Sequence, residues 1–273
     1  MAHCIVQSAE DILDKEFPVL NKGFVRLVDY MGSDERIVQA ARVSYSKGTK
    51  TVREDAALID YLLRNQHTSP FEQVVLTFHC KMPIFIARQW IRHRTARLNE
   101  ISGRYSVMED EFYMPDAQDI AKQSTNNKQG RGEIFPVDQA KEIQSLFANE
   151  QKKVYATYEK LINMGLAREL ARMNLPLSLY TQWYWQMDLN NLFHFLKLRL
   201  HSHAQKEIRL YARAILHIVE QVVPIAAQSF KQHIMGSVML SADETAALRK
   251  TFDEDKLGLD ERATRILKEK LGL

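Results

Sequence analysis

The sequence predicts a mixed α+β fold, in which long helices pack on a central sheet. Three segments are rich in β-branched or aromatic residues, at 23–30, 74–80 and 178–187, and such segments are typical of strands. Between and after them, apolar residues recur at helical spacing. Strands and long helices are therefore mixed along one chain of 273 residues, which is long enough for one large domain or two small ones.

The first ninety residues contain the local signals of five elements. Alternation of apolar and polar residues indicates strands, and apolar residues three and four positions apart indicate amphipathic helices. Ser33 precedes an acidic pair and can cap a helix, and Pro83 suits the first turn of another. The elements expected on these grounds are strands at 23–30 and 74–80 and helices from Ser33 to about Ser44, over 53–66 and over 84–90.

The rest of the chain is mainly helical. Residues 115–134 are polar and rich in turn-forming residues, so we expect a mobile loop there. Prolines and glycines mark the boundaries of the later patterns. The helices expected after the loop lie at 137–163, 165–173 and 190–223, with two more in a charged tail at 243–250 and 259–270. We therefore predict a main domain over residues 1–240 and a helical C-terminal extension over 241–273.

Composition excludes several classes of protein. Lysine and arginine number 37 against 34 acids, and a net charge of +3 is too small to predict nucleic-acid binding. Two cysteines exclude a disulfide framework and a cysteine-rich zinc site. The apolar runs are shorter than the ~20 residues that span a bilayer, and the first residues are too acidic for a signal peptide. We therefore expect a cytoplasmic protein with neither nucleic-acid nor membrane partners.

The most informative segment is 89–106. Its basic triplet at 92–94 cannot share one face of a helix, because each residue turns the chain by about 100°, so we place the triplet at a helix end. In an extended chain, Ser102 and Arg104 would then lie on the same side. Gly103 between them permits close approach of the backbone, so this stretch can cradle a phosphate. A solvated basic helix end is the plainer alternative.

A second pattern lies in the helix expected over 190–223. Arg199, His203 and Glu207 are spaced four residues apart and would share one helix face. This stripe could be a surface ion-pair ladder or a subunit contact. His194, His201, His203 and Glu207 could instead bind metal, but His201 and His203 would diverge on a helix. Only His203 and Glu207 have suitable spacing, and two ligands are too few for a zinc site. We therefore predict no metal.

These segments together resemble the flavin-dependent thymidylate synthases. The pattern Arg-His-Arg, seven residues, Ser-Gly-Arg over 92–104 looks like the signature of that family. The block His-Thr-Ser-Pro-Phe-Glu at 67–72 and the Leu-Arg…His-Ala-Gln-Lys-Glu-Ile segment at 198–208 are similar to two further family blocks. Arg172 matches a family arginine that precedes a Leu-Pro-Leu-x-Leu-Tyr-Thr strand, here 175–181. The resemblance covers residues 23 to about 235.

The resemblance implies the reductive methylation of dUMP to dTMP. The carbon donor would be 5,10-methylenetetrahydrofolate, and NADPH-reduced FAD would supply the hydride. It also implies a homotetramer with active sites at subunit interfaces, and Arg199 as the group that stabilises charge on the uracil. The residues expected at dUMP are Gln89, Arg92, Glu100, Ser102, Arg104, Arg172 and Arg199. Those expected at FAD are His67, Ser69, Arg92, His93, Arg94, Glu100, Asp188 and His194. Asp188 and His194 stand where family members often carry asparagine.

Other interpretations compete with this one. Thymidylate can also be made with a cysteine nucleophile, but Cys4 lies near the N-terminus and Cys80 in an apolar strand. Ser102 has no histidine base placed to deprotonate it. Two further hypotheses stay open: a nucleotide- or RNA-binding module that reads phosphates through residues 92–104, and a helical assembly protein whose arginines form salt bridges between subunits.

Overall fold

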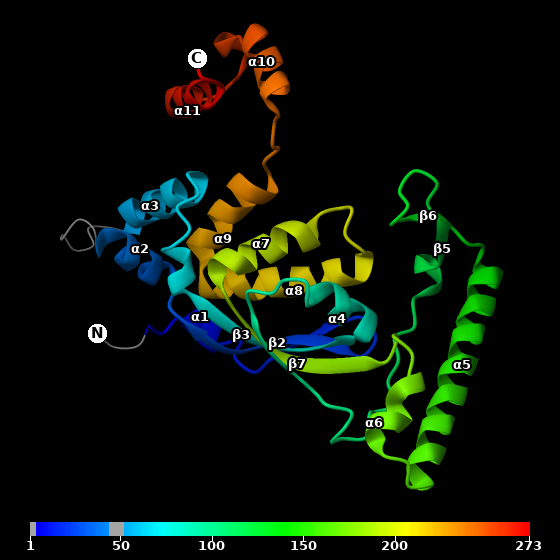
Figure 1. The fold of residues 1–273 in the computed structure, drawn as a ribbon. Helices are drawn as coiled ribbons and strands as arrows, with labels where there is room; N and C mark the ends of the chain where they lie inside the picture. Colours follow the sequence, from blue (N-terminus) through cyan, green and yellow to red (C-terminus); the bar gives the residue numbers. More distant parts are fainter. Residues whose placement is uncertain (1–3, 44–51) are drawn as a thin grey trace. The chain divides into compact units, whose positions relative to one another are not determined.

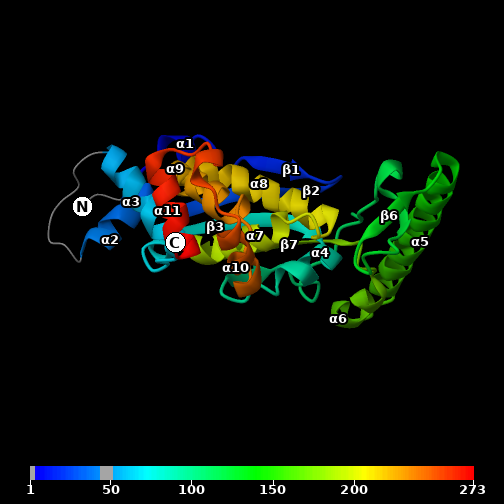
Figure 2. The ribbon, with the colours of Figure 1, turned by 90° about the horizontal axis from the view of Figure 1, so that it is seen from above.

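A computed structural model describes residues 4–43 and 52–273. The chain divides between Met235 and Gly236 into two compact units. The first unit contains the strands and the helices around them (Figures 1 and 2), and the second consists of short helices. Among the described residues no helix is both long and apolar enough to cross a membrane. The predicted mixed α+β class is confirmed.

The main sheet is antiparallel and has five strands in the order β1-β2-β3-β7-β4. The three predicted strands are confirmed at its centre as β2 (Gly23–Met31), β3 (Val75–Pro83) and β7 (Tyr180–Asp188). The edge strands, β1 (Glu16–Val19) and β4 (Arg97–Glu100), have only four residues each. Such short edges lack an apolar alternation long enough to be predicted from sequence.

Helices cover one face of this sheet (Figure 1). α8 (Lys206–Val222) packs against β1 and β2, α7 (Leu189–Leu200) against β7, and α4 (Ile84–Trp90) against β3 and β7. The ring of Trp90 lies 5.6 Å from that of Trp183, edge to face, and both side chains are fully buried. α4, which was predicted over these residues, is therefore anchored in the core, and the basic triplet emerges from a buried element.

The other elements of the first unit surround this core. The helices predicted over 53–66 and 137–163 are confirmed to within two residues. The predicted end of the helix at Ser44 lies outside the described residues. The remaining elements are α1 (Gln7–Glu10), α2 (Asp34–Arg42), α3 (Val52–Arg64), η2 (Phe71–Gln73), α5 (Val137–Asn163), α6 (Arg168–Ala171), η4 (Arg172–Asn174), α9 (Pro224–Phe230) and η5 (Lys231–Met235).

Two predictions for the middle of the chain are wrong in part. Residues 115–134 contain η3 (Ala117–Asp119) and a hairpin of β5 (Ala121–Gln123) with β6 (Arg131–Ile134). These strands are polar and mostly exposed, so backbone hydrogen bonds define them and no apolar pattern reveals them. The helix predicted over 165–173 is limited to the four residues of α6, followed by the 3₁₀ turn η4.

The helix predicted over 190–223 is interrupted. Its two parts, α7 and α8, are separated at His201, where ψ is 144° and the backbone is extended. Apolar spacing continues on both sides of this break, so the sequence pattern alone does not show it. The predicted stripe of Arg199, His203 and Glu207 is therefore wrong, because these residues do not lie on one continuous helix.

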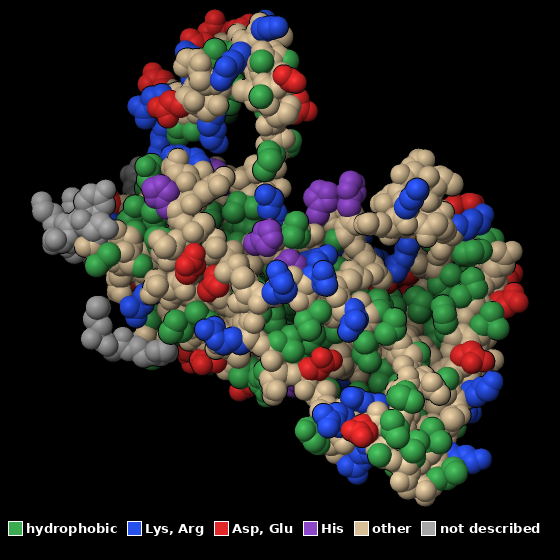
Figure 3. All heavy atoms as spheres, viewed as in Figure 1, with side chains coloured by type: hydrophobic (Ala, Val, Ile, Leu, Met, Phe, Trp, Pro, Cys, Tyr) green, Lys and Arg blue, Asp and Glu red, His purple; other side chains and the backbone are tan. Residues whose placement is uncertain are grey.

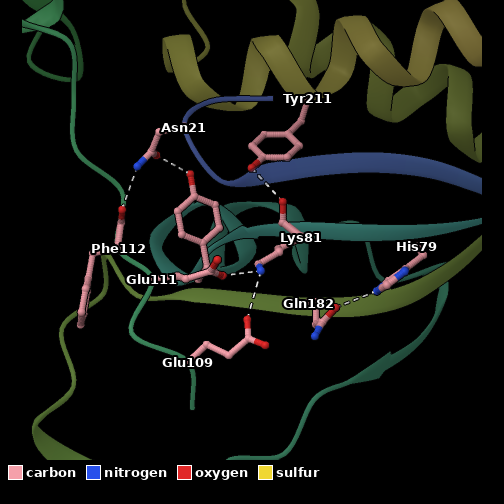
Figure 4. Close-up of polar contacts among 9 residues, drawn as sticks. Asn21, His79, Lys81, Glu109, Glu111, Phe112, Gln182 and Tyr211 are labelled. Atoms are coloured by element: carbon pink, nitrogen blue, oxygen red, sulfur yellow. Dashed lines mark hydrogen bonds and ion pairs between the residues drawn. The ribbon is translucent and has the colours of Figure 1, made fainter. Parts of the chain in front are cut away.

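A polar network fastens residues 109–112 to the end of the sheet (Figure 4). The Lys81 ammonium on β3 forms ion pairs with Glu109, at 3.2 Å, and with Glu111. The carbonyl of Lys81 accepts a hydrogen bond of 2.9 Å from the hydroxyl of Tyr211 on α8. The sheet, α8 and this segment are thereby held together, which determines where the chain towards α5 begins.

The second unit is a small helical extension. The two helices predicted in the charged tail are confirmed to within two residues, and Ser241 and Glu244 form a reciprocal capping box at the start of the first. Arg249 donates to the carbonyl of Leu271, which joins the two helices. The elements are α10 (Ala242–Lys250), η6 (Glu254–Lys256) and α11 (Glu261–Leu271).

Candidate active site

One group of predicted site residues lines a cavity between the end of α4 and α7. The basic triplet lies directly after α4, at a helix end as predicted. Figure 3 shows basic and histidine side chains gathered on the face where α7 lies. The cavity has a volume of about 550 Å³ and is lined by Arg92, His93, Arg94, Thr95, Asn191, His194, Leu198 and Arg199. Of these, Thr95, Asn191 and Leu198 are additional to the predicted set.

Arg199 is held at two points in this cavity. Its Nε donates to Nε2 of His93 at 3.0 Å, and its Nη2 donates to the carbonyl of Gln89 at 3.2 Å. Burial lowers the pKa of Arg199, but a guanidinium stays charged near neutral pH. The side-chain amide of Gln89 in turn donates to that of Gln205, just before α8. The structure thus presents a cation with a defined orientation.

His93 is a neutral acceptor for this cation. Burial, followed by the charges of Arg199 and His194, lowers the pKa of His93 to about 4. Because its Nε2 accepts from Arg199, its proton at neutral pH belongs on Nδ1. The ring also packs edge-on against Phe195, with 4.9 Å between centroids. His93 therefore orients the guanidinium without competing with it for an anion.

We predict a pH-dependent loss of stability from His93. Between pH 6.5 and about 4 the unfolded chain binds a proton at this histidine and the folded chain does not, so the free energy of unfolding falls as pH is lowered through that window. Urea unfolding at pH 5 to 7.5, at one protein concentration, should show wild type losing stability relative to His93→Gln. Glutamine keeps an acceptor for Arg199 but does not titrate. Parallel curves for the two proteins would contradict the prediction.

Asp188 organises the start of α7. Its side chain accepts from the backbone N–H of Asn191 at 3.0 Å and from the Asn191 amide at 2.7 Å. An aspartate at this N-cap position is favourable because the helix dipole stabilises negative charge there. The carboxylate therefore holds Asn191, which lines the cavity. An asparagine is thus present in the cavity, three residues later than the resemblance suggests.

His67 and Ser69 lie in the loop between α3 and η2. The 3₁₀ turn η2 packs against α7, where the ring of Phe71 lies 6.3 Å from that of Phe193. Both predicted side chains are exposed, and the ring of His67 packs edge-on against Tyr61. The loop is therefore adjacent to α7, whose other residues line the cavity.

A second group of predicted residues meets at α6 and η4. The N–H of Arg104 donates to the hydroxyl of Ser102 at 3.3 Å, and the Arg104 guanidinium lies 3.5 Å from Glu169. A Cβ atom added at Gly103 would lie 3.1 Å from Cδ of Arg172, so a larger residue there would press on the Arg172 side chain. The segment is a turn, in which the N–H of Tyr105 donates to the carbonyl of Ser102. The expected extended alternation is therefore wrong, although the expected residues do meet.

The strand β4 separates the two groups. The basic triplet of the first group precedes it in the chain, and Ser102 and Arg104 of the second group follow it, with the four residues of β4 between them, or roughly 13 Å of extended chain. Glu100 ends the strand, and its carboxylate accepts from the hydroxyl of Thr181 at 2.6 Å. In Figure 1 the chain leaves β4 towards α6, whereas α7 covers the helical face of the sheet.

Comparison with known proteins identifies the family. Residues 26–225 match the Thy1 family, described as thymidylate synthase complementing protein. A flavin-dependent thymidylate synthase of Treponema denticola is 61% identical over 260 residues, which are 95% of this chain and 98% of the relative. The chain belongs to the flavin-dependent thymidylate synthases. Another such enzyme, from Thermus thermophilus, is 60% identical over 85% of this chain and 84% of its own.

A solved structure supports the same assignment. The UMP/dUMP methylase PolB from Streptomyces cacaoi, bound with 5-Br dUMP, matches with a TM-score of 0.73 and 31% sequence identity, over 80% of this chain and 98% of that chain. The predicted resemblance is therefore confirmed, and with it the reaction. The enzyme methylates dUMP to dTMP with 5,10-methylenetetrahydrofolate, FAD and NADPH.

The residues in the cavity fit a phosphorylated cofactor such as FAD. Arg92 and Arg94 supply cationic donors for phosphate, and Asn191 presents an amide beside the N-terminus of α7. Neutral His93 can donate from Nδ1, because its Nε2 already accepts from Arg199.

Neither cysteine is placed to act as a nucleophile in the cavity at Arg199. Cys80 is fully buried in β3, and burial raises the pKa of its thiol, which keeps it protonated. Cys4 donates to the hydroxyl of Ser33 at 3.0 Å. Neither lines the cavity at Arg199. Within the described part of the chain, no group of three or more His, Cys, Asp or Glu side chains is placed to hold a metal ion.

Proposed function

We propose that the cavity between α4 and α7 binds the flavin together with the uracil of dUMP, with Arg199 as the catalytic residue. Methylation at C5 of uracil requires negative charge to develop on a ring carbonyl. A guanidinium that is already oriented stabilises this charge as it forms, without reorganisation. The observation that carries the proposal is the fixation of Arg199 by His93 and by the carbonyl of Gln89.

The remaining residues of the cavity have binding roles in this proposal. Gln89 and Arg92 lie along the nucleotide, and bound FAD supplies the hydride. Asp188 acts on the cofactor through Asn191, because both its oxygens are engaged by that residue. The residues proposed for FAD are His67, Ser69, Arg92, His93, Arg94, Glu100, Asp188 and His194.

The second group is proposed to bind the phosphate of dUMP. Arg104 is 55% exposed, and its contact with Glu169 is 3.5 Å long, so a phosphate that accepts shorter, charge-assisted hydrogen bonds would be a better partner. Ser102 and Arg172 lie against the same turn. Glu100, between the two groups, is proposed to approach both ligands.

A complete site is proposed to need more than one subunit. We propose that the first group of one chain binds the base of a nucleotide and the second group of another chain binds its phosphate, because β4 lies between the two groups within one chain. A homotetramer with sites at subunit interfaces would allow this arrangement, since one chain supplies the first group and a neighbour the second.

Cysteine is not required in this mechanism, and we predict that Cys80→Ala retains dTMP formation. The substitution leaves a small cavity in the buried face of β3, so the free energy of unfolding should fall by about 1 kcal/mol while kcat stays close to wild type. Thermal unfolding and a dTMP assay measure the two quantities. Cys4→Ala serves as the control. Abolished turnover in a folded Cys80→Ala enzyme would count against a flavin mechanism.

The absorbance of the purified protein tests the assigned chemistry. We expect a yellow protein whose flavin bands bleach when NADPH is added, and faster when dUMP is present. An RNA-binding module or a helical assembly protein would be colourless. A colourless protein that also fails to take up added FAD would overturn the proposal.

We further propose that residues 1–240 form the synthase domain and 241–273 an extension, in a cytoplasmic enzyme. The family match ends at residue 225, before the second unit begins. Both cysteines are free, which is in keeping with a reducing compartment.

A further inference from the structure

A second cavity lies beneath the β5–β6 hairpin and shares no lining residue with the one at Arg199. Its volume is about 560 Å³, which is in the range of small-molecule sites. α5 and the segment that leads to β5 form one side, and the starts of α4 and α8 form the other. The rings of Phe85, Phe135 and Phe147 make much of its wall apolar.

A buried carboxylate forms the polar end of this cavity. Glu207 is only 1% exposed, and its Oε1 accepts from the hydroxyl of Tyr113 at 2.8 Å and from Arg131. Its Oε2 has no hydrogen-bond partner among the described residues. Burial acts to raise the pKa of Glu207, but the hydrogen bonds it accepts and the charge of Arg131 together outweigh burial and hold the pKa below its usual value. An ionised oxygen that lacks a donor is costly, and a ligand donor would remove that cost.

The charges around the cavity favour a cation. The lining contains three acids, Asp119, Glu150 and Glu207, and one base, Arg131. Asp119 is paired with Lys206, and Glu207 with Arg131. Among the described residues this leaves the charge of Glu150, at the exposed side of the cavity, unbalanced by a base. An anion would meet an uncompensated carboxylate here, whereas a ligand with charged N–H donors would be attracted.

Gln205 connects this cavity to the catalytic one. It lines the cavity beneath the hairpin, and its amide oxygen accepts from the side chain of Gln89. The carbonyl of Gln89 is one of the two acceptors that orient Arg199. A ligand that orders the start of α8 would therefore also order the residues proposed to hold the uracil.

We propose that the cavity beneath the hairpin binds a small aromatic cation of the amidine or aminopyridine class, and that this binding strengthens the binding of dUMP. The ring lies among the phenylalanine side chains, the Glu207 side chain turns its buried Oε2 towards the cavity, and one N–H of the ligand donates to that oxygen. The effect passes to the catalytic cavity through Gln205 and Gln89. The ligand makes no contact with Arg199 itself.

Benzamidine is the probe that tests the proposal on the FAD-loaded enzyme. Calorimetry should show saturable binding of one benzamidine per chain, and benzoate, its anionic counterpart of nearly equal shape, should not bind at this cavity. In Glu207→Gln the loss of a hydrogen bond to a charged acceptor should weaken benzamidine about tenfold or more. In wild type, saturating benzamidine should lower the KM for dUMP about fivefold.

Glu207→Gln also leaves Arg131 without an ionised partner, which could lower the stability of the fold. A second variant therefore separates the effect on ligand binding from an effect on folding. Val154→Phe fills the cavity from α5 and leaves the contacts of Glu207 in place, so it should abolish benzamidine binding. Leu146→Phe, on the exposed part of the same helix, should bind as wild type does. Equal benzamidine affinity in all four proteins would overturn the site. Binding without a change in KM would overturn the link to dUMP.

Discussion

Replacing Arg199 by alanine is expected to leave a folded protein that binds FAD but has lost most of its turnover. The guanidinium is held at 3.0 Å from His93 and 3.2 Å from the carbonyl of Gln89, so its removal takes away one oriented donor for the charge that develops on uracil. Removing such a donor costs ~2–4 kcal/mol of transition-state stabilisation, or about 10²–10³-fold in kcat. Initial rates of dTMP formation at saturating dUMP measure the effect.

Two further variants test whether the effect depends on the orientation of the Arg199 guanidinium. Arg199→Lys keeps the charge but cannot donate to both acceptors, so its kcat should lie between those of alanine and wild type. Arg213→Ala removes an exposed arginine from α8, which should leave kcat unchanged. Flavin absorbance and circular dichroism show that each variant is folded and loaded. Near-normal kcat in Arg199→Ala would remove this residue from the catalytic role.

Mixing two inactive variants is expected to restore activity. Arg199→Ala damages the first group and Arg172→Ala the second, where lost hydrogen bonds to phosphate should raise the KM for dUMP by about 10–100-fold. If each site takes its groups from two chains, random mixing places both intact groups together in about a quarter of the sites. Co-expressed, differently tagged chains, purified through both tags, should then regain roughly that share of wild-type activity at low dUMP.

The matched control uses two variants of the same group. Arg92→Ala and Arg199→Ala both damage the first group, because both side chains line its cavity, so their mixture has no site with an intact first group and should stay inactive. Activity that fails to return in the Arg199→Ala and Arg172→Ala mixture, despite assembly of mixed oligomers, would place both groups of one site in one chain. That outcome would contradict the shared site while leaving the reaction unchanged.

Much of the fold could be predicted because its central elements carry strong local patterns. β2, β3 and β7 alternate apolar with polar residues, since one face of each strand packs under helices. The edge strands and the β5–β6 hairpin were not predicted, because strands of three or four residues are too short to show an alternation. The interruption of the helix at His201 was not predicted either, because the helical spacing of apolar residues continues on both sides of it.

The site, too, contains residues that could be predicted from sequence and residues that could not. The basic triplet, the turn at Ser102 and Arg172 could be named from their spacing, because binding two phosphorylated ligands requires these residue types. Asn191 could be found only through its contact with Asp188, since a single asparagine in a helix carries no distinguishing pattern. The role of Gln205 becomes apparent only from its hydrogen bond with the side chain of Gln89, 116 positions away in the chain.

The sequence by itself determined the chemistry of this protein: which arginines, histidines and hydroxyl groups are present, in what order, and hence the family and its reaction. The tertiary structure decided which of them meet. α4 brings His93 to Arg199 because its apolar face is buried against β3, β7 and α8. The register of β4 on β7 carries Ser102 away from that cation. Contacts between residues so distant in the chain depend on how whole elements pack, which no local pattern encodes.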